Sequence, residues 1–179
     1  QEWAWRIWLL CPDPRGMSAR IDRRRTATAP WLQANLSNFA AWFPPTFAAK
    51  PTAMFKAVRA LEPALPGLVE LRVSEGELEA RFERDGKTSS YSLDELSDGE
   101  RTLIALYVVL HVLAVPGRVL LLDEPDNYLG LWEIQPWLAE LSDRALRSDG
   151  PQVILISHHP EALNFLAPEH GWRVFRDES

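Results

Sequence analysis

The sequence predicts an α/β domain, in which helices flank a parallel sheet and an insertion of helices and antiparallel strands precedes the main helix. Two short apolar runs, at 119–122 and 153–156, are typical of strands buried on both faces of a parallel sheet. A helical segment at 131–147 separates them, and such a strand, helix and strand form a right-handed parallel unit. Residues 68–93 alternate between polar and apolar side chains, which predicts antiparallel strands.

Composition limits the classes of protein to consider. The chain has 179 residues, enough for one domain with its own core, and its 46% hydrophobic content is ordinary for a globular protein. The net charge of −6 argues against a general nucleic-acid-binding surface but is compatible with a local basic patch. The single cysteine, Cys11, excludes an internal disulfide and suits a reducing cytoplasm. No apolar run approaches the roughly 20 residues of a membrane span, so we expect a cytoplasmic protein.

The first third of the chain predicts one strand, a loop and two helices. Aromatic and branched residues at 3–10 predict the strand. The arginine-rich segment 15–30 predicts a loop, which is either a solvated basic surface or a contact for phosphate or a partner. Apolar residues at helical spacing predict helices at 31–43 and 52–62, the first ended by Pro44-Pro45.

Three strands of an antiparallel meander follow. They are expected at 68–73, 77–84 and 88–93, with Gly76 in the first turn and Asp85-Gly86 in the second. Their alternation leaves one face of this sheet in solvent.

A long apolar helix then begins at a small turn, Leu96-Ser97-Asp98-Gly99-Glu100. Ser97 and Glu100 match the S-x-x-E capping box, and the apolar residues from Leu103 to Leu113 predict a buried helix. Free N–H groups and the helix dipole at such an N-terminus attract an anion, and Gly99 lets the backbone approach it. The capping pattern alone is equally typical of an ordinary core helix.

Polar residues that can bind ligands or transfer protons follow the two apolar strands. Asp123 and Glu124 end the first strand and are followed by Pro125-Asp126, and Ser157-His158 ends the second. Parallel pairing would bring Asp123 and His158 together at the carboxyl edge of the sheet, where open α/β sheets bind ligands. Acids at a strand end, or a histidine there, also occur as plain structural groups, so it is their combination that is informative.

Taken together, these segments resemble the signature, Walker B, D-loop and His-switch motifs of ABC-type ATPase heads. Such heads occur in SMC and recombination ATPases, and the closer resemblance is to AAA_21-like ATPases. The resemblance implies a P-loop NTPase-like sheet. The family's signature is usually written LSGGQ, so Asp98 and Glu100 are departures from it.

The resemblance also implies roles for individual residues in a Mg²⁺-dependent ATPase. Asp123 would hold Mg²⁺, Glu124 would act as the base on the attacking water, and His158 would contact the γ-phosphate. Asp126 would lie in the D-loop along a dimer seam. The residues of the signature turn would face ATP held by the other subunit: Ser97, Asp98, Gly99 and Glu100.

A phosphate-binding loop is absent from this sequence. No segment matches G-x-x-x-x-G-K-[ST], the motif that wraps the phosphates. We therefore predict that residues 1–179 form one ABC-ATPase-like domain fragment, with a helical and β-meander subdomain at about 11–94 and the motif-bearing core at about 95–179. The missing Walker A lobe is expected in a longer native chain, since the first residue is Gln1, or in a separate subunit, and the isolated chain is expected to bind ATP weakly.

Three alternatives remain at this point. The chain could be a non-catalytic, degenerate half-ATPase that acts as an interaction module through its signature and D-loop face. It could be an ATP-gated, DNA-associated switch in repair or phage defence, for which Arg20–Arg25 is the local support. It could also be a plain α/β domain with chance motifs, which three ordered motifs at sheet ends argue against.

Overall fold

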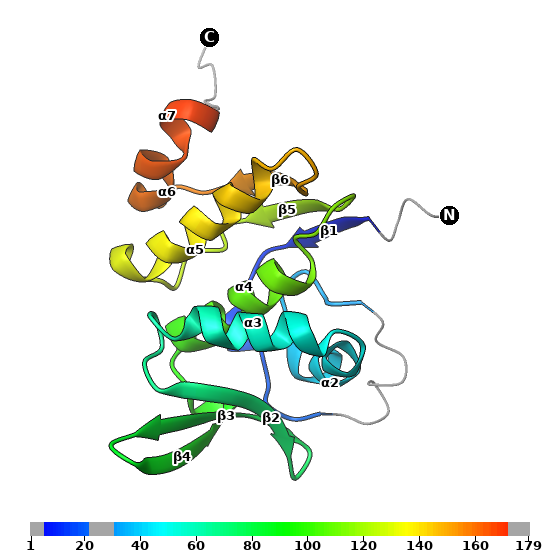
Figure 1. Cartoon of the computed structure of the whole chain (residues 1–179), viewed down its shortest axis with the longest axis vertical. Helices are drawn as coiled ribbons and strands as arrows, with labels where there is room; N and C mark the ends of the chain where they lie inside the picture. The colour runs from blue at the N-terminus through cyan, green and yellow to red at the C-terminus, as the bar shows by residue number, and fades with distance from the viewer. Residues whose placement is uncertain (1–5, 22–30, 172–179) are drawn as a thin grey trace.

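Two sheets enclose a layer of helices in the computed structural model, which describes residues 6–21 and 31–171 (Figure 1). The parallel sheet has the order β1-β5-β6, and the antiparallel sheet has the order β2-β3-β4. Their strands are β1 (Ile7–Leu10), β5 (Val119–Asp123), β6 (Gln152–Ile156), β2 (Leu68–Ser74), β3 (Glu77–Arg84) and β4 (Lys87–Ser92). This arrangement confirms the predicted α/β class with its antiparallel insertion.

The helices between the two sheets are α2 (Phe39–Ala49), α3 (Pro51–Leu61) and α4 (Asp98–Val112) (Figure 1). Every residue of α4 from Thr102 to Val112 is buried, which is the expected environment for a helix that is apolar on all sides. Because α4 is fixed in the core along most of its length, its N-terminal turn has a defined position at the edge of the molecule.

Parallel pairing of β5 and β6 is observed as predicted. Leu121 is in register with Ile154, and Asp123 with Ile156, so the carboxyl ends of both strands meet at one edge. Of the strand predicted at 3–10, residues 3–5 lie outside the described residues and Arg6 is in a turn. The strand is observed over Ile7–Leu10 and pairs with β5.

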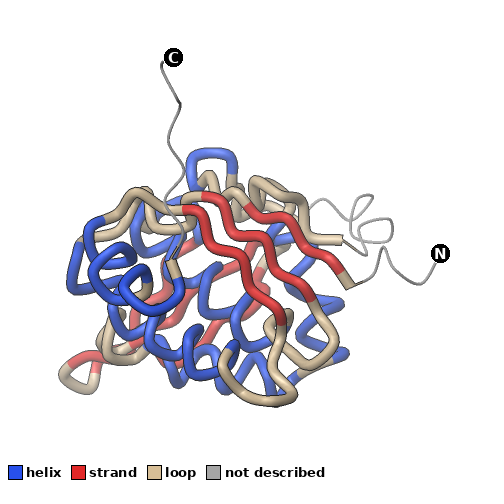
Figure 2. Tube along the Cα trace, turned by 90° about the horizontal axis from the view of Figure 1, so that it is seen from above, coloured by secondary structure: helices blue, strands red, loops and turns tan. Residues whose placement is uncertain are grey.

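One face of the parallel sheet is exposed, which corrects the prediction that its strands are buried on both faces. The inner face is fully packed by Leu10, Leu120 and Leu122, each 1% exposed. The outer face carries apolar side chains that register places on the same side: Ile7 (51% exposed), Leu9 (56%), Ile154 (47%) and Ile156 (59%). In Figure 2 these strands face the viewer with no helix of the described residues in front of them. An apolar run indicates an apolar environment but cannot show which element supplies it.

The first predicted helix is wrong in its bounds. The sequence pattern predicts 31–43, but α2 begins at Phe39 and continues through both prolines to Ala49. Leu36 has a left-handed φ of 62°, and the Asn38 side chain bonds to Trp31 O and Gln33 N, so this part forms turns. Burial of the aromatic residues from Phe39 to Phe43 outweighs the backbone bonds that the prolines remove.

The remaining helices are α5 (Leu131–Ala145), α6 (Pro160–Phe165) and α7 (Ala167–His170), with short 3₁₀ turns η1 (Pro14–Gly16) and η2 (Leu93–Glu95). The helix predicted at 131–147 is observed with close bounds, and α7 was not predicted from the sequence. Among the described residues, none of these helices or the others is both long and apolar enough to cross a membrane. The sequence also predicts a last strand at 172–175, a segment that lies outside the described residues.

The arginine-rich segment is described only in part. Arg20 Nε lies 3.6 Å from Glu77 Oε1, which gives this arginine an acidic neighbour within the chain. Arg23, Arg24 and Arg25 lie outside the described residues, so nothing in the fold adds to the DNA-associated alternative.

Candidate functional site

Glu124 and His158 meet at the carboxyl ends of β5 and β6. The Glu124 amide donates to Ile156 O at 2.8 Å, which ties the two strand ends together. Glu124 has a left-handed φ of 45°, a conformation that non-glycine residues rarely adopt and that is frequent at functional sites. Its Oε1 lies 2.9 Å from His158 Nδ1. Two residues that are 34 positions apart in the sequence therefore form one polar pair.

Both oxygens of the Glu124 carboxylate have partners. Asn127 Nδ2 donates to Oε2 at 2.8 Å, and Oε1 contacts His158. The Asn127 bond and then the His158 bond lower the pKa of Glu124, which keeps it ionised. Because a carboxylate only accepts, His158 Nδ1 must carry the hydrogen, which leaves Nε2 as the nitrogen available to a ligand. Asn127 was not singled out from the sequence, since an asparagine in a turn carries no distinctive signal.

Asp126 is buried, with 1% of its surface exposed, and it organises the loop rather than presenting its carboxylate to solvent. Ser157 Oγ donates to Asp126 Oδ2 at 2.5 Å, and the His159 amide donates to Ser157 Oγ at 2.9 Å. This chain of bonds fixes the segment after β5 against the segment after β6. The adjacent His158 is held in place by the same network.

His159 has a different task from His158. Its Nδ1 accepts the Glu161 amide at 3.2 Å as the N-cap of α6, and its Nε2 lies 3.3 Å from Leu129 O. Both ring nitrogens are thus used inside the chain. Of the two histidines, His158 is the one that contacts Glu124.

Asp123 points to the exposed face of the parallel sheet, since it shares register with Ile156. Within the described residues it has no hydrogen bond or ion pair. Its charge helps to raise the pKa of the Cys11 thiol, after partial burial of that thiol, which places the carboxylate beside the end of β1. No group of three or more metal-binding side chains occurs among the described residues. A single free carboxylate fits Mg²⁺ that keeps most of its waters and arrives with phosphate oxygens.

The signature turn contains the predicted capping box. The Glu100 amide donates to Ser97 Oγ at 3.2 Å, and Glu100 Oε2 accepts from both the amide and the hydroxyl of Ser97 at 2.9 Å. The hydroxyl of Ser97 is therefore bonded to a carboxylate within its own turn. It must leave Glu100 before it can donate to any ligand.

Two arginines flank Asp98, the acid that departs from the usual signature. Arg101 NH2 lies 2.5 Å from its Oδ1, and Arg15 Nε lies 3.6 Å from its Oδ2. Arg15 also lies over the Tyr128 ring, 5.5 Å from the ring centroid. The arginines offset the negative charge of Asp98 beside an anion-attracting helix N-terminus. The sequence predicts only that Arg15 lies in an arginine-rich loop, either solvated or in contact with phosphate or a partner, and the contact with Asp98 comes from the tertiary structure.

Gly99 brings the signature turn against the loop that follows Glu124. A Cβ atom at Gly99 would lie only 3.1 Å from Tyr128 O. The N-terminus of α4 therefore packs closely on the same loop that carries Glu124 and Asp126. The sequence-predicted site residues are thus distributed around one loop rather than over separate faces.

A parallel sheet with acids at its carboxyl edge and helices packed on it is a P-loop NTPase-like arrangement. The chain belongs to the ATPase family AAA_21, described as "AAA domain, putative AbiEii toxin, Type IV TA system", which matches residues 18–164. No curated protein matches the chain.

One solved structure of an SMC head shares the fold of this chain, and two other SMC structures match it with lower scores. The SMC head bound to the C-winged helix domain of ScpA has a TM-score of 0.54 and 18% identity, over 88% of this chain and 49% of that one. An SMC ATPase from work on ATP-driven dimerization and DNA-stimulated activation has a TM-score of 0.49 and 20% identity, over 66% and 76%. The SMC head with a coiled coil and joint from Pyrococcus yayanosii has a TM-score of 0.48 and 20% identity, over 66% and 24%. The chain thus spans about half of the first and a quarter of the last.

Proposed function

We propose that this chain supplies the hydrolytic half of an ATP-binding site that a second, phosphate-binding lobe completes. The contact between Glu124 and His158 carries the proposal, because it joins an ionised carboxylate and an imidazole at a ligand-binding edge of the sheet. Family membership supports ATP as the substrate class.

Each residue at the strand ends has a chemical role that fits its surroundings. Asp123, which has no hydrogen-bond or ion-pair partner among the described residues, would hold Mg²⁺, which supplies positive charge next to the phosphates. Glu124 would orient the attacking water and accept its proton after releasing Asn127 or His158. His158, whose Nδ1 is bonded to Glu124, would direct Nε2 towards the terminal phosphate.

The signature turn would act on ATP bound by another subunit in a dimer with nucleotide between the two copies. Ser97 and Gly99 offer a hydroxyl and a helix N-terminus with backbone amides, and Arg15 and Arg101 offset the charge of Asp98. Asp126 would hold the D-loop in position at the dimer seam through its bond with Ser157. The Ser97 hydroxyl would exchange its bond to Glu100 for one that it donates to the incoming phosphate.

The exposed face of the parallel sheet is where we place the missing lobe. Parallel sheets of α/β proteins are covered on both faces, yet Leu9 and Ile156 are more than half exposed. A cavity of about 690 Å³ opens along the free side of β6, between α5 and the α6–α7 pair. A strand, loop and helix added beside β6 would cover this apolar surface and bring the loop close to Asp123.

ATP turnover of the completed protein tests this function. With the Walker A lobe supplied, either in a longer native chain or as a separate subunit, Glu124→Gln should lower the hydrolysis rate at least about 100-fold while ATP binding persists. Glu62→Gln, at an exposed position away from the site, is the control. An unchanged rate in Glu124→Gln would exclude the proposed base. Robust turnover by the isolated chain, lost in Glu124→Gln, would show that no second lobe is required.

A non-catalytic interaction module is the second candidate, and the exposed sheet face favours it. In that case a protein partner would cover Leu9 and Ile156 without a phosphate-binding loop. The two candidates differ in one measurement, because only the first predicts that the assembled complex binds ATP in a Mg²⁺-dependent way.

A further inference from the structure

β4 is an edge strand with only one of the features that usually prevent edge-to-edge pairing, a single lysine at its first residue. It pairs with β3 over Lys87–Ser92 without a bulge, and Lys87 is the only charged residue in it. β2, at the other edge of the same sheet, has a bulge between Leu68 and Glu70. Natural sheets protect their edges with bulges and charges, so β4 is the edge of this sheet that is open to another strand.

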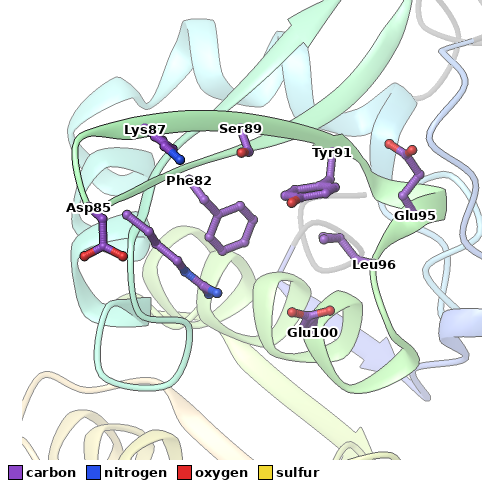
Figure 3. A pocket seen from close by; sticks show the side chains of 9 residues that line it. Phe82, Asp85, Lys87, Ser89, Tyr91, Glu95, Leu96 and Glu100 are labelled. Carbon is purple, nitrogen blue, oxygen red and sulfur yellow. The ribbon is translucent and has the colours of Figure 1, made fainter.

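Charges of opposite sign lie at the two ends of this edge. Figure 3 shows the cavity beneath β4, with a volume of about 460 Å³, between the strand and the first turn of α4. Its basic end is lined by Arg84 and Lys87 together with one acid, Asp85, so this end carries a net positive charge. Its acidic end is lined by Glu95 and Glu100. The ring of Tyr91, which is 43% exposed, lies between the strand and the acidic end.

The basic end is held in a fixed arrangement. Arg84 Nε donates to Pro66 O at 3.1 Å, and the guanidinium lies over the Phe82 ring, 5.4 Å from the ring centroid. Gly67 leaves space for this side chain, because a Cβ there would lie 2.9 Å from Arg84 Cγ. The terminal nitrogens of Arg84 have no partner among the described residues and remain available to an acid from outside the chain.

We propose that β4 pairs antiparallel with β4 of a second copy of this chain, across a twofold axis at Ser89. This register places Lys87 opposite Tyr91 of the second copy, and Ser89 opposite its own equivalent. The antiparallel copy reverses the edge, so its acidic end lies beside the basic end of the first copy. A parallel copy would instead place Lys87 beside the same lysine, which disfavours it.

Side-chain direction supports the same register. Lys87, Ser89 and Tyr91 line the cavity and therefore share one face of the strand. Pairing odd-numbered with odd-numbered residues keeps this face continuous in both copies, as an antiparallel sheet requires. The two antiparallel sheets would then form one sheet with both cavities on the same side. The paired backbones belong to β4 and not to the signature turn, although Glu100 borders both regions, and the pairing does not require ATP.

Sedimentation velocity of the 179-residue chain without nucleotide tests the pairing, from about 10 µM to about 500 µM, since a short edge contact is expected to be weak. We expect a reversible monomer–dimer equilibrium in the native sequence. Ser89→Asp and Ser89→Lys should each weaken association at least tenfold, because each places like charges opposite one another at the axis. An equimolar mixture of the two variants should recover a heterodimer. Thr52→Asp and Thr52→Lys, at an exposed position of α3, are matched controls and should associate like the native chain.

Three outcomes would overturn the proposal. A native chain that stays monomeric over this range would leave the β4 edge to a strand of some other protein. Ser89 variants that associate as the native chain does would place the dimer contact elsewhere. A mixture that fails to associate, with circular dichroism showing both variants folded, would exclude the register centred on Ser89.

Discussion

Gly67 illustrates how strongly a single residue is constrained by what it touches. It has a positive φ of 87°, and a Cβ atom there would lie 2.8 Å from Glu83 O and close to Arg84. We expect Gly67→Ala to destabilise the protein by about 2 to 4 kcal/mol, through both backbone strain and overlap with a neighbouring strand. Gly76→Ala is the control, because Gly76 has a φ of 84° but no atom of the described residues lies within 4 Å of the added Cβ. It should cost only about 1 kcal/mol.

Urea denaturation of both variants measures this difference in the free energy of unfolding. Equal losses for Gly67→Ala and Gly76→Ala would show that overlap of the added Cβ with Glu83 O does not contribute to the destabilisation.

His111 should make stability depend on pH. It is 9% exposed, its Nδ1 accepts from Arg144, and its Nε2 lies 3.1 Å from Glu140. Burial lowers the pKa of His111 below its ordinary 6.5, so the unfolded chain binds more protons than the folded chain just below pH 6.5. The free energy of unfolding should therefore decrease as the pH falls from 7 through 6.5 towards the lowered pKa.

His111→Gln, which cannot titrate, should flatten the stability profile in that window. Thermal or urea unfolding at half-unit pH steps would measure the effect. A decrease of the same slope in the variant would assign the pH dependence to other groups.

At the scale of elements, the capping box of α4 both stabilises the helix and forms part of the proposed site, since Ser97 and Glu100 belong to the signature turn. Ser97→Ala removes the acceptor of the Glu100 amide, and we expect a loss of about 1 kcal/mol in the free energy of unfolding. Ser148→Ala, in an exposed loop position, should change stability by less than about 0.5 kcal/mol. Chemical denaturation of both variants provides the comparison. A loss at Ser97 no larger than that at Ser148 would mean that Glu100 alone caps the helix.

Most elements follow from local sequence patterns, and α2 shows where this reasoning ends. Capping and apolar periodicity predict α4, and the Asp85-Gly86 turn predicts the hairpin of β3 and β4. The pattern at 31–43 is also apolar, but the positive φ of Leu36 and the Asn38 bonds delay the helix. The helix then continues through two prolines. Local sequence rules predict that such prolines end a helix, so it is tertiary burial of the helix that stabilises it here.

At the scale of the whole molecule, the two faces of the parallel sheet should respond differently to the same substitution. Leu122 is 1% exposed and Ile156 is 59% exposed. We expect Leu122→Thr to cost about 3 kcal/mol or more, because it places a hydroxyl in the core. Ile156→Thr should cost less than about 1 kcal/mol and should lower the binding of a hydrophobic dye.

Unfolding curves and dye fluorescence of the isolated chain provide both measurements. Comparable losses of stability for Leu122→Thr and Ile156→Thr would show that something in the chain covers the outer face in solution.

The sequence alone determined the two apolar strands, the capped helix and which polar residues follow each strand. These features depend on residues that are close in the sequence and on their periodicity. The sequence also determined that a phosphate-binding loop is absent from these 179 residues. Only the tertiary structure decided that Glu124 contacts His158, that Arg15 reaches Asp98, and that Asp126 is buried. It also decided that one sheet face stays exposed. Contacts between segments far apart in the sequence depend on which surfaces pack together, and a local pattern does not contain that information.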